Sequence, residues 1–286
     1  MLFDIIEIRK GIKTMPNYVT ADNTKLYYET EGDGQPVVFI HGWSSSHEAF
    51  AGMVKTMKDK YRCISYSHRG HGASEVAERG YSIPQLARDL KELIDYLALK
   101  DVILVGHSMG GYTIYDYISQ FGCDNISKVV IIDMSPKVLC DDEWKFGAFG
   151  NYDEKGLCND MELIGQDLPK FMWKFTKQVL PSMAALPDAL ADLVSPGLKG
   201  INHTLPLLAL WHSMFSHDYR NAIPAITVPA AYVFPEHPIY PRGAAEYFKD
   251  KAGAPVQIIE EPGCTHMCVL EKPLQIANDI LSFLEK

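Results

Sequence analysis

A serine and a histidine far apart in the chain have the settings that nucleophilic catalysis requires. Ser108 lies in the run GHSMG (106–110), between an apolar stretch typical of a buried strand and a stretch with helical periodicity. Glycines on both sides allow the sharp strand-to-helix turn that pushes a serine hydroxyl outward. A free hydroxyl is a poor nucleophile and needs a base, for which His266, on a loop expected after the last strand, is the candidate. The structural alternatives are a small residue in a tight turn for Ser108 and a capping or packing histidine for His266.

The elements that would position these residues alternate along the chain. Short runs that are apolar throughout alternate with amphipathic helical stretches, which is typical of a parallel sheet covered by helices on both faces. The clearest helix spans 82–99, where apolar side chains recur with a helical period behind the start signal of Ser82 and Pro84. The expected strands are 36–40, 61–66, 101–106, 129–133, 229–234 and 255–260, and the other expected helices are 47–59, 109–121, 242–251 and 274–284.

The alternation stops between residues 136 and 222. This segment has no strand-like run, but it has helical stretches rich in aromatic residues and methionine. We therefore expect an α/β core formed by residues 1–135 and 223–286, with 136–222 inserted as a helical cap, or lid. Its apolar residues could simply form the buried faces of its own helices, but a lid over a nucleophile must also exclude water and hold substrate. The candidate pocket residues are Trp211, Met214 and Phe215.

Four motifs, in the right order, resemble those of the α/β-hydrolase superfamily. They are FIHGW (39–43), YSHRGHGAS (66–74, with Ser67 where aspartate is usual), GHSMGG (106–111) and GCTHMCVLEKP (263–273). The match covers nearly the whole chain and is similar to the carboxylesterase and haloperoxidase-like branch with a helical cap. The resemblance implies a mostly parallel central sheet flanked by helices, Ser108 as nucleophile and His266 as base. It also implies an oxyanion hole formed by the backbone N–H groups of Trp43 and Met109, and leaves His41 a structural residue.

The carboxylate that should complete a triad departs from the family pattern. Most members carry an aspartate after the seventh strand, but aligning VFPEHPIYP (233–241) on its last proline puts His237 there and Glu236 one residue earlier. A histidine cannot supply the anion that orients an imidazole. Asp133 ends an expected strand beside the one that precedes the serine, at the sheet edge where active sites gather. The alternatives are Glu236 as the acid and a turn or helix cap as the role of Asp133. The expected triad is Ser108, Asp133 and His266.

This set of groups favours acyl transfer, because two backbone donors would stabilise the oxyanion that forms at an attacked carbonyl. We expect a carboxylesterase that cleaves small, apolar esters through an acyl-enzyme intermediate and needs no cofactor. Thioester, lactone or carbon–carbon bond hydrolysis and cofactor-free perhydrolysis would use the same residues. A haloalkane dehalogenase is disfavoured because it needs a carboxylate where Ser108 stands. Outside the enzymes, the alternative is a ligand-sensing protein with slow turnover.

Composition limits the partners. The 286-residue chain has a net charge of −9 and no Lys/Arg run, which argues against nucleic acid or an anionic membrane and favours a small-molecule ester.

The first residues do not resemble a signal peptide, no window has the length of a membrane span, and the six cysteines are scattered, so we expect a cytoplasmic protein. Cys264, His266 and Cys268 lack a fourth ligand for structural zinc, so no metal is expected. Oligomeric state has no signal in the sequence.

Overall fold

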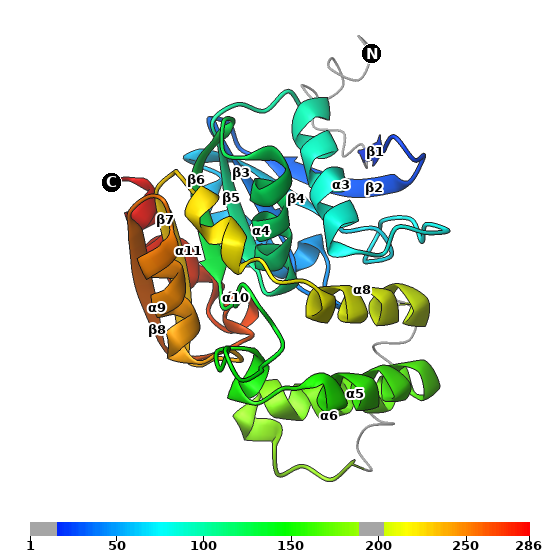
Figure 1. Cartoon of the computed structure of the whole chain (residues 1–286). Helices are drawn as coiled ribbons and strands as arrows, with labels where there is room; N and C mark the ends of the chain where they lie inside the picture. Colours follow the sequence, from blue (N-terminus) through cyan, green and yellow to red (C-terminus); the bar gives the residue numbers. More distant parts are fainter. Residues whose placement is uncertain (1–15, 189–202) are drawn as a thin grey trace.

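The computed structural model describes residues 16–188 and 203–286, and its core is an eight-stranded sheet (Figure 1). The strand order is β1-β2-β4-β3-β5-β6-β7-β8. The first two strands pair antiparallel with their neighbours, and all pairs from β4 to β8 are parallel, as the alternating pattern predicts. The strands are β1 (Asn17–Val19), β2 (Lys25–Glu31), β3 (Gln35–Ile40), β4 (Tyr61–Tyr66), β5 (Val102–His107), β6 (Ile126–Ile132), β7 (Ala230–His237) and β8 (Val256–Thr265).

Helices cover both faces of this sheet. Alternate residues of β3 enter two separate apolar clusters, with Val38 and Ile40 in one and Val37 and Phe39 in the other. The central strands are mostly apolar because both of their faces are buried. The first cluster contains side chains of α3 (Ile83–Tyr96), α4 (Met109–Phe121) and α9 (Arg242–Lys251), and the second contains side chains of α2 (Ala51–Met57), α10 (Cys268–Glu271) and α11 (Pro273–Leu284). The short helix η2 (His47–Phe50) precedes α2.

The chain between β6 and β7 forms the remaining helices. In Figure 1, α5 and α6 lie below the core, with α8 between them and the sheet. The indole of Trp211 on α8 packs against that of Trp43 in the loop after β3, with ring centroids 4.9 Å apart. Residues 189–202 of the expected lid lie outside the described residues, and its boundaries at 136 and 222 stay a prediction. The helices are η3 (Ala148–Gly150), α5 (Glu154–Gln166), α6 (Leu168–Val179), η4 (Pro181–Met183), α8 (Thr204–Ser216) and η7 (Arg220–Ala225).

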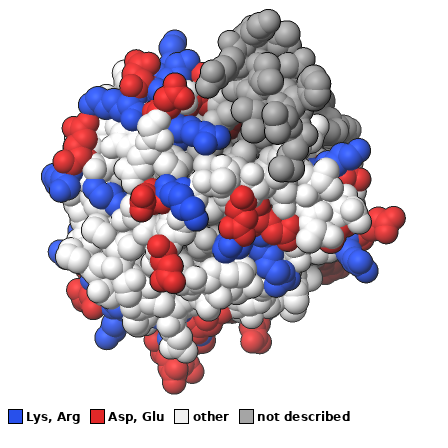
Figure 2. Space-filling model, turned by 90° about the horizontal axis from the view of Figure 1, so that it is seen from above, with Lys and Arg blue, Asp and Glu red and all other residues white. Residues whose placement is uncertain are grey.

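The surface has no large region of one charge on the face that Figure 2 presents. Lysine and arginine are interspersed there with aspartate and glutamate, and most of the visible surface outside the grey atoms is uncharged. None of the helices in the described part of the chain is long and apolar enough to span a membrane.

Close packing of α4 on the sheet depends on Gly110. A Cβ atom at this position would lie 1.9 Å from the backbone oxygen of Ile40, so α4 would have to move away from β3. We expect Gly110→Ala to lower the free energy of unfolding by about 1–3 kcal/mol or more, measured by urea denaturation. Gly165 in α5 is the control, because a Cβ there meets nothing within 4 Å and alanine is the better helix former. Equal loss of stability in both variants would contradict this packing argument.

Candidate active site

Ser108 occupies a strained turn between β5 and α4. Its backbone has φ 52° and ψ −123°, a region that residues other than glycine rarely adopt. The tight turn requires glycine at position 106, because a Cβ atom there would lie 2.6 Å from the backbone of Gly110. The Ser108 N–H donates to Ile132 O (3.0 Å), and Ser108 O accepts from Tyr112 N–H (3.1 Å), so the backbone is held on both sides. The side chain faces a cavity, and the described residues give its hydroxyl no hydrogen-bond partner.

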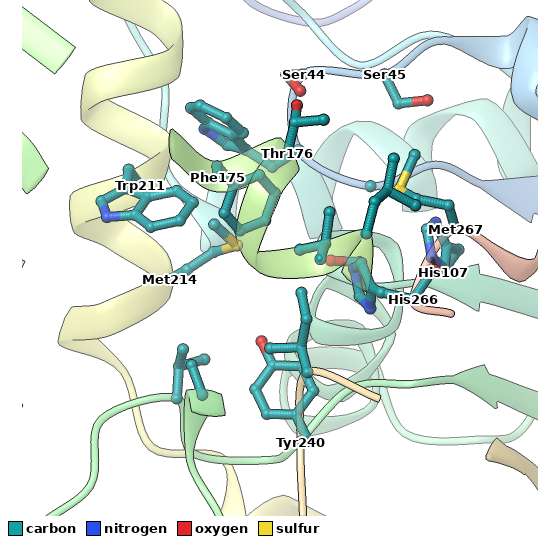
Figure 3. Close-up of a pocket in the computed structure, with 18 of the residues that line it drawn as sticks. Ser44, Ser45, His107, Phe175, Thr176, Trp211, Met214, Tyr240, His266 and Met267 are labelled. Atoms are coloured by element: carbon teal, nitrogen blue, oxygen red, sulfur yellow. Dashed lines mark hydrogen bonds between the residues drawn. The ribbon is translucent and has the colours of Figure 1, made fainter. Parts of the chain in front are cut away.

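His266 and Asp133 form a buried pair next to this serine. His266 Nδ1 lies 2.7 Å from Asp133 Oδ2, and the side chains are 3% and 0% exposed. Because an ionised carboxylate can only accept, Nδ1 carries the proton and Nε2 is left as a free acceptor. His266 and Ser108 line the same cavity, and Figure 3 shows His266 there. Contacts between a nucleophile and its base are often long without substrate and tighten once substrate binds.

The carboxylate of Asp133 is held by the backbone around it. Asp133 directly follows β6, has φ 43°, and donates its N–H to Val233 O at 3.1 Å. Its Oδ2 accepts a second hydrogen bond, 2.9 Å long, from the N–H of Ile239. This amide follows β7, the strand after which most α/β-hydrolases are expected to carry the acid. The loop after β7 therefore orients the carboxylate instead of supplying it.

Glu236, the alternative acid, lies elsewhere. It stands near the end of β7 with an exposed side chain, and its Oε2 accepts from the N–H of Gly263 at 2.6 Å. The neighbouring His237 pairs with Thr265 of β8. The structure thus brings the imidazole of His266 to Asp133, while Glu236 binds the backbone that leads to the histidine loop.

His107 holds the backbone of His266, a role that the sequence alone did not predict. Its Nε2 lies 2.7 Å from His266 O, and a carbonyl can only accept, so this nitrogen is the donor. Burial, together with the nearby His266, lowers the pKa of His107 to about 3 and keeps its ring neutral. Its position inside the GHSMG run was the only available signal.

Two backbone amides flank Ser108. The described hydrogen bonds give neither the Trp43 N–H nor the Met109 N–H an acceptor. Met109 is the first residue of α4, where N–H groups are unpaired and the helix dipole favours negative charge. A Cβ atom on Gly42 would lie 3.2 Å from Ser108 Cβ, so the loop carrying Trp43 passes close to the serine. The Trp43 indole N–H donates to Leu207 O on α8 at 2.9 Å, which ties this loop to the lid segment.

The cavity at Ser108 has a volume of about 180 Å³. Its wall is mostly apolar and comes from the loop after β3, the lid helices and the loop after β7 (Figure 3). An apolar cavity of about 150 Å³ holds benzene in another protein, so this cavity suits a group of about that size. The three residues singled out as pocket candidates, Trp211, Met214 and Phe215, all line it.

Comparison with known proteins shows the family. The model of the Alpha/beta hydrolase family matches residues 37–279, and the chain belongs to this family. A non-heme chloroperoxidase from Kitasatospora aureofaciens is 38% identical over 126 residues, which are 44% of this chain and 46% of that protein. The chain thus aligns with about half the length of this relative.

Two solved structures share the fold over almost the full length. An esterase from Exiguobacterium antarcticum has a TM-score of 0.82 at 24% identity, covering 96% of this chain and 100% of its own. A bromoperoxidase from Bacillus anthracis has a TM-score of 0.81 at 25% identity, covering 95% and 100%. The α/β-hydrolase fold expected from the four motifs is confirmed.

The choice between the two carboxylates can be tested without knowing the substrate. We expect Asp133→Asn to slow covalent labelling of Ser108 by a fluorophosphonate about 10³- to 10⁴-fold, because the uncharged amide neither fixes the tautomer nor stabilises the imidazolium. Glu236→Gln should label within about twofold of wild type, since this side chain does not contact the imidazole. Mass spectrometry of the intact protein follows the reaction. The opposite ranking of the two variants would overturn the role given to Asp133.

Proposed function

We propose that this protein is a serine hydrolase that cleaves carboxylic esters of small, apolar substrates. The observation that supports this most strongly is that the strained Ser108, Trp43 and His266 line one cavity, with His266 bonded to Asp133 and with no acceptor for the N–H groups of Trp43 and Met109 among the described hydrogen bonds. Each group alone has a structural explanation. Their meeting at one point matches the parts that acyl transfer needs.

The proposed reaction follows from which nitrogen of His266 carries a proton and which is free to accept one. Ser108 Oγ attacks the ester carbonyl while His266 Nε2, the nitrogen not bonded to Asp133, takes the hydroxyl proton. The tetrahedral intermediate collapses, and His266 returns this proton to the departing alkoxide. Water then attacks the acyl-enzyme by the same route and releases the acid and free Ser108. Asp133 stays ionised and stabilises the imidazolium in both halves of the cycle.

Charge that develops on the carbonyl oxygen is met by the amides of Trp43 and Met109. In a well-studied protease, loss of one oxyanion donor costs about 3 kcal/mol of transition-state stabilisation. The donors are effective because they are already oriented, Met109 by the start of α4 and Trp43 by its indole contact with α8. The lid segment would therefore contribute to catalysis as well as to binding.

A second candidate, perhydrolysis, is favoured by the names of the relatives, which include a non-heme chloroperoxidase and a bromoperoxidase. In this reaction hydrogen peroxide replaces water as the nucleophile that attacks the acyl-enzyme, and a peracid leaves. No further residue is needed. Thioester, lactone and carbon–carbon bond hydrolysis would also begin with the same attack by Ser108.

The proposed setting is the cytoplasm, with a small-molecule ester as partner and neither nucleic acid nor a membrane. All six cysteines are unpaired, in agreement with a reducing compartment. Among the described residues, no three His, Cys, Asp or Glu side chains are grouped so that they could hold a metal ion. The proposed mechanism needs no metal.

Hydrolysis of p-nitrophenyl esters tests the proposal. We expect kcat/KM to rise from acetate to an acyl chain of about four to six carbons, as the cavity fills, and to fall for much longer chains. The Ser108→Ala protein is the blank, and addition of hydrogen peroxide reports peracid formation in the same assay. Wild-type rates equal to this blank for every chain length would refute the ester hydrolase. Release limited to a single slow turnover would favour the ligand sensor.

A further inference from the structure

The cavity contains a hydroxyl that the proposed mechanism does not use. Tyr240 lines the cavity with Ser108 and is only 5% exposed. Figure 3 shows its oxygen directed into the space between Met214 and His266. None of the hydrogen bonds among the described residues involves this oxygen. The oxygen is not completely buried, so it is open to the cavity and can exchange a water for a group that enters there.

The backbone around Tyr240 is fixed from three directions. The N–H of Ile239 donates to Asp133 Oδ2 at 2.9 Å, and the carbonyl of Ile239 accepts from Phe149 N–H at 2.7 Å. On the other side, Pro241 O accepts from Ala244 N–H at 2.8 Å, where α9 begins. The backbone that carries the phenol ring is therefore held in place, which lowers the ordering that a hydrogen bond from its hydroxyl costs.

The hydroxyl is a neutral donor. Burial raises the pKa of Tyr240, and the nearby Asp133 raises it further, so the proton stays on the oxygen. A substrate with only hydrocarbon in the cavity would displace water from this group and leave it unpaired. A substrate with an oxygen acceptor at that place would satisfy it.

We propose that Tyr240 is a specificity-determining residue, whose hydroxyl donates a hydrogen bond to an ether, carbonyl or hydroxyl oxygen in the acyl part of the substrate. This inference rests on the proposed ester hydrolysis and narrows its substrates to esters of oxygen-bearing acids. Thr176 of α6 also lines the cavity, and its hydroxyl likewise has no hydrogen bond among the described residues. It lies on the opposite side of the pocket in Figure 3 and provides a matched control.

The test uses pairs of p-nitrophenyl esters in which one CH₂ of the acyl chain is replaced by oxygen. The pairs are methoxyacetate with butanoate, 3-methoxypropanoate with pentanoate, and 4-methoxybutanoate with hexanoate. For each pair, the ratio of kcat/KM values is compared between wild type and variant, which cancels the intrinsic reactivity of the esters. We expect Tyr240→Phe to lower this ratio about 5- to 100-fold for at least one pair, with the hydrocarbon ester unchanged or cleaved faster.

The control and the remaining outcomes decide the role. Thr176→Val should change both members of every pair alike and keep the wild-type ratios. The proposal is overturned if Tyr240→Phe alters both members equally, if it leaves every ratio unchanged, or if Thr176→Val is the variant that lowers a ratio. If wild type cleaves no ester faster than Ser108→Ala, the proposed function fails and this inference fails with it. If esters are cleaved but the ratios do not respond to Tyr240→Phe, only this inference fails.

Discussion

The hydrogen bond between His266 Nδ1 and Asp133 Oδ2, 2.7 Å long and almost fully buried, is the contact on which the rest of the site depends. A buried carboxylate is costly unless donors offset its desolvation, and among the described residues both donors, the imidazole and the N–H of Ile239, bind Oδ2, while the buried Oδ1 has no partner. Asp133 Oδ2 thus connects three segments: the end of β6, the loop after β7 and the histidine loop after β8. A change at any of these three chain segments would shift the imidazole relative to Ser108.

The lid segment and the core are connected through the same residues that would do the chemistry. The Trp43 indole binds Leu207 O on α8, while the preceding residue, Gly42, lies close to Ser108. The loop after β7 gives its Ile239 N–H to Asp133 and its Ile239 carbonyl to Phe149, at the entrance of the lid segment. Pocket shape and catalytic geometry are therefore not independent. Substitutions that reshape the lid should also affect the proposed oxyanion donors and the proposed acid.

The sequence predicted those parts of the site that follow from local backbone rules. Glycines around Ser108 indicate the tight turn, and parallel strands that end together place Asp133 near it. It favoured Asp133 as the acid but left Glu236 as an alternative, because both follow strand-like runs and only the tertiary structure shows which carboxylate meets the imidazole. The sequence did not predict strand β2, because the second half of Lys25–Glu31 is polar. The contacts of His107 and Tyr240 depend on loops that come together from distant parts of the chain. The spacing of residues along the sequence does not predict such contacts.

The most direct test of this account is a proton NMR spectrum of the imidazole N–H groups at low temperature. The account predicts a far-downfield resonance from the His266 Nδ1 proton in wild type, because that proton is held between nitrogen and a buried carboxylate. This resonance should disappear in Asp133→Asn and remain in Glu236→Gln. A resonance that persists without the Asp133 carboxylate, or that is lost with Glu236→Gln, would contradict the central pairing.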